Sequence, residues 1–184
     1  MQVRIATDQP WDVKADVLVV PVLGQPTFTG PLGELDKRAG KELSSLADLP
    51  GIIVRRPWET ELATTTAQFD GVDVRGKAVL VHTGWDRHWR TDRYGVDHPF
   101  LTAEAADWLV EQGAALVGID SNNIDDTRVR ARPVHSKLLA ADIPICEHMT
   151  GLGSLPDEGF RFSAVPPKVR GMGTFPVRAY AVLG

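Results

Sequence analysis

The chain of 184 residues is poor in cysteine and has no long apolar run. Cys146 is the only cysteine, so no disulfide can form within the chain, which is typical of proteins in a reducing compartment. No segment approaches the roughly 18 apolar residues that a membrane span needs. The start, residues 1–8, lacks the apolar core of a signal peptide. These absences predict a cytoplasmic protein with no membrane partner.

Basic residues are not in excess either, since the formal net charge is −4. A chain without a positive excess cannot neutralise many phosphates, so we expect no nucleic-acid partner. Arginines do cluster, and the simplest interpretation is two solvated loops at positions 87, 90 and 93 and at 128, 130 and 132. With 43% hydrophobic and 24% charged residues, the composition is that of a soluble globular domain that buries its own core.

The N-terminal part predicts a short strand at 2–6, a second strand and one helix. Residues 16–23 form a nearly continuous run of β-branched and apolar side chains, as in a strand buried on both faces. Apolar side chains then recur at steps of three and four from Leu32 to Leu46, which predicts an amphipathic helix. Residues 15–22 and 32–37 resemble the start of the amino-terminal domain of leucyl aminopeptidases. That region is not the catalytic domain of the family, so the resemblance implies no catalytic residue here.

From Lys77 onward the pattern of strands and helices becomes regular. We expect strands at 78–82, 115–120 and 143–146, a helix from the N-cap Thr102 to Gly113, and a short helix at 136–141. This alternation predicts parallel strands joined by right-handed crossovers. Further strands are expected at 52–55, 160–166 and 177–183, and a polar connection at 57–76 with Phe69 and Val72 as its anchors. The expected fold class is α/β with a parallel or mixed sheet.

This order brings chemically useful residues to one edge of the sheet. His82, Asp120 and Glu147 each follow a predicted strand, and the carboxyl ends of parallel strands lie on one edge, where ligands usually bind. His135 precedes the short helix and should lie on the same rim. Imidazole and carboxylate together suit zinc or manganese, so the sequence predicts a metal site with His135, Glu147 and, as a third candidate, Asp120. A turn or cap residue is the simpler alternative for Asp120.

The loop at 83–100 is rich in aromatic side chains. Trp85, Trp89 and Tyr94 could line an apolar pocket for an aromatic substrate, or they could pack the loop onto the sheet. His88 could form a hydrogen bond to a substrate, although an exposed loop histidine is the commoner case. Trp85 and His88 are therefore the candidate substrate contacts.

Several stretches in the right order resemble the metal-dependent cyclase family, which includes bacterial kynurenine formamidases and isatin hydrolases. The matching stretches are 80–89, 98–101, 116–120, 133–135, 143–147 and 175–178. The resemblance implies a compact α/β swivelling domain and metal-assisted hydrolysis of an amide or lactam by a bound water. His135 and Glu147, twelve residues apart, look like the metal ligands of the family's second half.

The chain departs from this family in its first half, where the family carries the motif His-x-Gly-Thr-His-x-Asp. None of the five histidines forms that motif, and residues 82–86 imitate it but lack the second histidine. The cyclase likeness begins near Ser45, so the aminopeptidase-like segment stands where the motif is expected. We therefore expect a fusion of residues 1–47 with a cyclase-like part at 48–184, packed as one compact unit.

The missing motif limits the function that the resemblance implies. A catalytic zinc normally keeps three protein ligands and an open position, and the family pattern supplies two. Asp120, His82 or His148 could provide the third, although no motif of the family supports any of them. We expect a relative of arylformamidase-like hydrolases with impaired or no catalysis, whose substrate, if it is active, is a small amide. The alternatives are a non-catalytic α/β module that binds a ligand or a partner, and a recombined scaffold without a selected function. A sheet edge left bare by the missing strand predicts a homo-oligomer.

Overall fold

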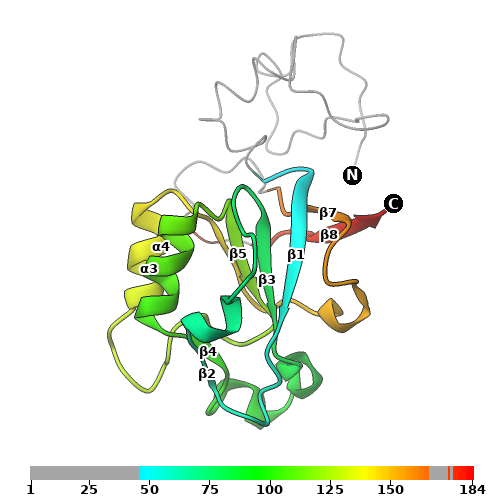
Figure 1. Ribbon diagram of the computed structural model, residues 1–184. Coiled ribbons are helices and arrows are strands. Elements are labelled where there is room, and N and C mark those ends of the chain that lie inside the picture. Colours follow the sequence, from blue (N-terminus) through cyan, green and yellow to red (C-terminus); the bar gives the residue numbers. More distant parts are fainter. Residues whose placement is uncertain (1–45, 166–173, 175) are drawn as a thin grey trace, which may run out of the picture. The chain divides into compact units, whose positions relative to one another are not determined.

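The computed structural model describes residues 46–165, 174 and 176–184 (Figure 1). The N-terminal strands and most of the helix expected from the sequence lie outside the described residues. The chain divides into two compact units, of which the second comprises Leu49–Phe162 and Ala181–Gly184. This second unit holds nearly all of the sheet and all the candidate site residues.

The described sheet has six strands in the order β6-β5-β3-β1-β7-β8 (Figure 1). Their bounds are β1 Leu49–Arg55, β3 Ala78–His82, β5 Leu116–Ile119, β6 Ile145–Cys146, β7 Phe160–Ser163 and β8 Tyr180–Leu183. Strands β6, β5, β3 and β1 pair in parallel, and β7 pairs with β1 in the antiparallel sense. The expected α/β class with a parallel or mixed sheet is confirmed, and the sheet is mixed.

Two helices, α3 (Ala103–Gln112) and α4 (Pro133–Ala140), cover one face of this sheet (Figure 1). They supply the crossovers from β3 to β5 and from β5 to β6, as the alternation predicts. Helix α3 is capped by the Thr102 side chain and ends at Gly113, which adopts the left-handed φ of 77°. Between helices and sheet lies a core of fully buried side chains that includes Val79, Val117 and Leu109.

Several element bounds differ from the expectation, among them those of β7 and β8, which are shorter than the expected 160–166 and 177–183. Helix α4 begins at Pro133 rather than 136, so His135 lies in its first turn instead of before it. Strand β1 begins at Leu49 rather than 52, because Pro50 and Gly51 already pair with β7. Strand β6 is shorter than expected, since the backbone N–H of Ile143 donates to Leu138 of α4.

The connections contain short elements that sequence periodicity did not resolve. Strands β2 (Ala63–Thr64) and β4 (Phe100–Leu101) form a small parallel pair. Single 3₁₀ turns lie at Thr66–Phe69, Trp85–His88, Asp92–Gly95 and Leu152–Ser154. The expected anchors of the polar connection are confirmed, because Phe69 is fully buried and Val72 packs against the core.

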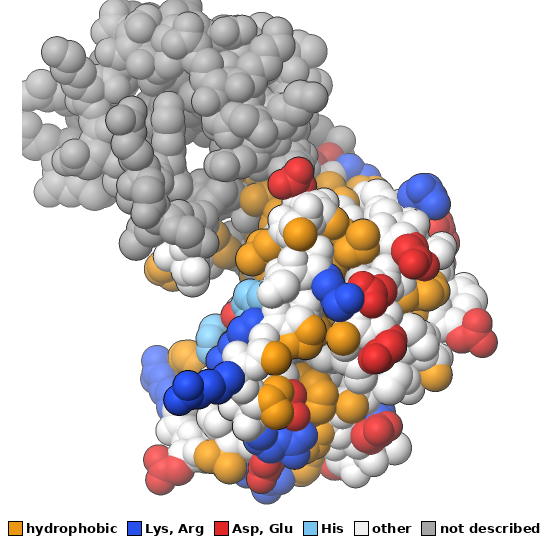
Figure 2. Space-filling view, turned by 90° about the vertical axis from the view of Figure 1, so that its left-hand side faces the viewer, with side chains coloured by type: hydrophobic (Ala, Val, Ile, Leu, Met, Phe, Trp, Pro, Cys, Tyr) orange, Lys and Arg blue, Asp and Glu red, His pale blue; other side chains and the backbone are white. Residues whose placement is uncertain are grey.

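Two further features concern the surface and the lengths of the helices. On the face shown in Figure 2, acidic and basic side chains are interspersed with apolar ones. No helix within the described ranges is both long enough and apolar enough to cross a membrane.

On the face of the sheet opposite the helices, two glycines leave room for larger side chains to pack against the backbone. A Cβ atom added to Gly51 would lie 2.6 Å from Cδ2 of the Phe160 ring on β7, a separation that real structures do not tolerate. A Cβ atom added to Gly118 of β5 would lie 2.6 Å from Sδ of Met149. These glycines therefore let Phe160 and Met149 pack directly on the sheet.

Replacing Gly51 by alanine should lower the free energy of unfolding by about 1–3 kcal/mol, because the rigid Phe160 ring must move. Chemical denaturation of the full chain measures this change. Gly95→Ala is the matched control, since no atom lies within 4 Å of its added Cβ. Equal stability of the two variants would contradict the packing described here.

Candidate functional site

A buried carboxylate organises the start of helix α4. Asp125 is fully buried and accepts hydrogen bonds from the backbone N–H groups of Val134 at 2.7 Å and His135 at 3.1 Å. Its Oδ2 also lies 2.6 Å from Nδ1 of the His135 ring. Because a carboxylate only accepts, Nδ1 of His135 carries the proton of this hydrogen bond, and Nε2 is the ring nitrogen that Asp125 leaves unengaged. Asp125 thus caps the helix and orients the imidazole.

Glu147, directly after β6, faces this imidazole. Its Oε1 lies 3.7 Å from Nε2 of His135 and accepts the backbone N–H of Ile124 at 2.7 Å. The side chains of His135 and Glu147 are 28% and 20% exposed, so the pair is open to solvent at the rim. The structure therefore brings together two of the three residues that the sequence assigns to a metal.

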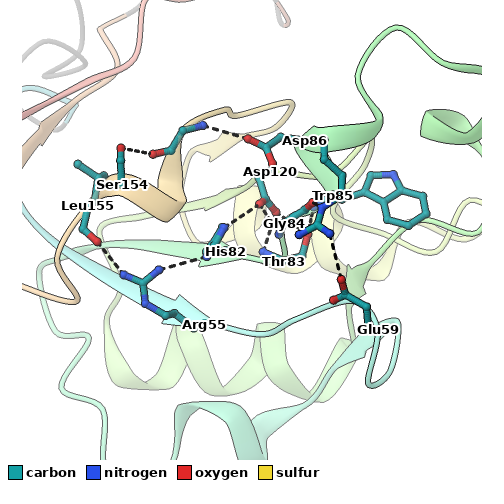
Figure 3. Close-up of polar contacts among 12 residues, drawn as sticks. Arg55, Glu59, His82, Thr83, Gly84, Trp85, Asp86, Asp120, Ser154 and Leu155 are labelled. Atoms are coloured by element: carbon teal, nitrogen blue, oxygen red, sulfur yellow. Dashed lines mark hydrogen bonds and ion pairs between the residues drawn. The ribbon is translucent and has the colours of Figure 1, made fainter.

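Asp120, the third candidate, is engaged elsewhere. It is fully buried and accepts hydrogen bonds from the Thr83 backbone at 2.8 Å, the Thr83 hydroxyl at 2.5 Å and the Gly84 backbone at 2.7 Å (Figure 3). Burial raises the pKa of Asp120, and the bonds from Thr83 and Gly84 act in the opposite direction. No described contact of Asp120 reaches His135 or Glu147. Its carboxylate therefore holds the turn after β3. This is the turn or cap role that the sequence offered as the simpler alternative to metal binding.

His82 lies between this turn and the end of β1. Its Nε2 is 3.9 Å from Oδ2 of Asp120, and its Nδ1 accepts a hydrogen bond from Arg55 at 3.2 Å (Figure 3). Arg55 in turn donates to Asp157 and to the backbone oxygen of Leu155, each at 2.7 Å. The network joins the carboxyl ends of three parallel strands to the segment before β7.

The donors present do not complete a catalytic metal site. Among residues 46–165, 174 and 176–184, no group of three or more His, Cys, Asp or Glu side chains could hold a metal ion. Residues 1–45, 166–173 and 175 contain neither histidine nor cysteine, so all five imidazoles of the chain lie among the described residues. His135 and Glu147 offer two donors where a catalytic zinc normally has three. A metal at His135, Glu147 and Asp120 stays a prediction, and the described residues alone do not supply the three ligands of a catalytic zinc.

The two candidate substrate contacts lie in a packed aromatic cluster. Trp85 is 1% exposed, donates from Nε1 to the backbone oxygen of Tyr94 and meets Trp58 and His88 edge to face. Burial lowers the pKa of His88, and the nearby positive charge of Arg93 lowers it further. Trp85 therefore packs the loop, one of the two roles that the sequence left open. A substrate contact by Trp85 or His88 stays a prediction.

Sequence reasoning missed one residue that borders the rim. Asp125 carried no cap signal, because it lies eight residues before Pro133 and the N-cap position is occupied by Arg132. His148 follows Glu147 directly, and its Nδ1 lies 3.1 Å from the Tyr94 hydroxyl. Beside it, the ring of Trp89 is 6.1 Å from the His148 ring, and Trp89 is 48% exposed. An exposed tryptophan therefore lies against His148, the residue that follows Glu147.

Asp125→Asn should lower the free energy of unfolding by about 1–3 kcal/mol, since an amide has one acceptor oxygen for three donors. Thermal or urea unfolding measures the loss. Asp126→Asn is the control, because Asp126 pairs with the exposed Arg128 and should cost less than about 1 kcal/mol. A loss no larger than the control's would refute the capping role.

Tyr94 should ionise late in an alkaline titration. Burial, followed by the negative charges of Asp120, Asp86 and Glu147, raises the pKa of Tyr94 to about 12. The native state therefore holds this proton more tightly than the unfolded chain, and stability should fall as the pH rises above about 10. Phenolate absorbance should show one late step, and Tyr94→Phe should remove it. A Tyr94 step near pH 10 in the folded chain would contradict this environment.

Three comparisons place this geometry among known proteins. Residues 54–126 match the model of the Cyclase family, a range that includes Asp120 and Asp125 and stops before His135. The chain is 28% identical over 89 residues to a kynurenine formamidase of Erythrobacter litoralis, a match covering 46% of this chain and 38% of that protein.

Solved structures extend the likeness in fold. An isatin hydrolase A from Ralstonia solanacearum superposes with a TM-score of 0.70 at 20% identity, over 82% of this chain and 64% of that one. A protein described as a predicted metal-dependent hydrolase, from Bacillus stearothermophilus, gives 0.63 at 25% identity, over 74% and 64%. The chain therefore spans less than two thirds of these relatives. It is cyclase-like in sequence over residues 54–126 and in fold over most of its length.

Proposed function

We propose that this chain is a relative of arylformamidase-like, metal-dependent amide hydrolases that retains half of a metal site and has impaired hydrolysis. One observation carries the proposal: Nε2 of His135 faces Glu147 at 3.7 Å while a buried Asp125 holds Nδ1 at 2.6 Å. A carboxylate on the far nitrogen of a histidine is the usual support of a metal-binding imidazole. The relatives named kynurenine formamidase and metal-dependent hydrolase agree with this interpretation.

Impaired hydrolysis follows from the number of donors. A metal-dependent hydrolase uses its ion to generate a nucleophilic hydroxide, and a catalytic zinc normally keeps three protein ligands for this purpose. The described residues contribute two, and Asp120 is committed to Thr83 and Gly84. We therefore expect the pair to bind zinc or manganese weakly, without turnover of a small amide.

A second candidate is a non-catalytic module that binds a partner. The observation that favours it is Trp89, which is 48% exposed although its ring packs edge to face against Tyr94 at 5.0 Å. Large aromatic side chains that are both exposed and held in place are typical of protein-binding surfaces. The two candidates are compatible, because a retained half-site and a binding surface can lie on the same rim.

Hydrolysis assays test the first candidate. With N-formylkynurenine or isatin and added zinc or manganese, the full chain should show no turnover above that of His135→Ala and Glu147→Ala. Equilibrium dialysis with zinc should nevertheless show weaker binding by both variants than by the unaltered chain. Ser136→Ala, on an exposed neighbour in α4, is the control for helix integrity. Metal-dependent turnover that either variant abolishes would overturn the claim of impaired catalysis.

A further inference from the structure

Two loops of the second unit concentrate positive charge in a chain that is acidic overall. Residues 87–97 and 126–132 together contain six arginines and three aspartates, whereas the whole chain has a formal charge of −4. We refer to these two loops together as the arginine surface. Four of its arginines are exposed and make no ion pair within the described part of the chain: Arg90, Arg93, Arg130 and Arg132. Exposed charges of one sign without counter-charges favour a partner of the opposite sign.

The two loops touch each other and carry exposed aliphatic side chains where they meet. Nη1 of Arg128 in the second loop lies 3.9 Å from Oδ1 of Asp97 in the first, and its guanidinium lies 5.6 Å from the centre of the Phe100 ring. Val96 and Val129 are the sequence neighbours of this ion pair and are 58% and 53% exposed. The arginine surface therefore offers apolar contacts beside its unpaired positive charges.

Arg93 is held in place by aromatic rings. Its guanidinium lies 4.7 Å from the centre of the Trp58 ring and 5.4 Å from that of Trp85. Trp85 is itself fixed, since it is 1% exposed and donates from Nε1 to the backbone oxygen of Tyr94. A guanidinium that stacks on aromatic rings keeps the N–H groups of its edge for a carboxylate, which it can bind through two parallel hydrogen bonds. Because the side chain is already held, less conformational entropy is lost when a carboxylate binds.

We propose that the arginine surface binds an acidic protein segment that also carries aliphatic side chains. Carboxylates of this segment pair with Arg93 and the other unpaired arginines, and its aliphatic side chains contact Val96 and Val129. A nucleic acid fits less well, because it has a phosphate at every nucleotide and cannot avoid the three aspartates of the surface. A peptide can place its carboxylates opposite the arginines alone. This inference rests on the second candidate function, whose partner it specifies, and is independent of the metal half-site.

Fluorescence anisotropy with the full chain tests this inference. The probe is a labelled peptide of alternating aspartate and leucine, about twelve residues long, which spans roughly 40 Å when extended. The peptide should bind, and added salt should weaken the binding, because salt screens exposed charges. Arg93→Ala should weaken binding about tenfold, since arginines at the centre of interfaces often dominate their energies. Val129→Ser should weaken it about threefold through the loss of apolar contact.

Matched variants separate this surface from a general attraction of charges. Arg75→Ala removes an exposed arginine that precedes β3 and lies outside the arginine surface, so this variant should bind as the unaltered chain does. Arg93→Lys keeps the charge but lacks the planar fork, and it should bind more weakly than the unaltered chain. Circular dichroism verifies folding, and Arg93→Lys serves as the test if Arg93→Ala fails to fold. His135→Ala should leave peptide binding unchanged, which keeps this result separate from the metal half-site.

Several outcomes would overturn the inference. These are absence of peptide binding, equal losses for Arg75→Ala and Arg93→Ala, and equal binding of a polyglutamate peptide, which has no aliphatic side chains. Tighter binding of a single-stranded DNA than of the peptide would assign the surface to nucleic acid instead. Binding of an alternating lysine and leucine peptide in place of the acidic one would retain a partner-binding surface but overturn its acidic partner.

Discussion

The candidate site depends on one buried carboxylate, that of Asp125. In a fully buried position it accepts two backbone N–H groups of helix α4 and the Nδ1 proton of His135. A charge removed from water is tolerable only when hydrogen bonds replace its hydration, and three donors do so here. The same bonds set where α4 starts and which nitrogen of His135 faces the rim. The carboxylate of Asp125 therefore determines both the start of helix α4 and the orientation of the His135 ring.

Asp120, directly after β5, is likewise a buried carboxylate whose hydration is replaced by hydrogen bonds. Its carboxylate accepts two backbone N–H groups and a hydroxyl from the turn after β3, so Asp120 and Asp125, which both lie in the β5 to α4 connection, serve as internal anchors. Glu147 differs, because it has one hydrogen bond and remains partly exposed. Asp120 and Asp125 are therefore buried, structural carboxylates, whereas the partly exposed carboxylate of Glu147 is available to a ligand.

The fold determines where the polar residues lie, and the number of metal donors among them limits the chemistry. The parallel strands collect polar residues at their carboxyl ends, as this topology does in many enzymes, whereas the chemistry depends on how many donors converge there. Among the described residues two donors converge there, with Nε2 of His135 3.7 Å from Oε1 of Glu147. The proposal of impaired hydrolysis follows from that number.

The sequence by itself determined the α/β class, the parallel order of β3, β5 and β6 and the presence of His135 and Glu147 on one rim. These follow from periodicity and strand order, which are local properties of the chain. Only the tertiary structure decided that Asp120 is bound to Thr83, thirty-seven residues earlier, and that Trp85 is buried against Trp58. It also moved the start of α4 to Pro133 through Asp125. These contacts join residues that are far apart in the sequence, so no local sequence pattern could predict them.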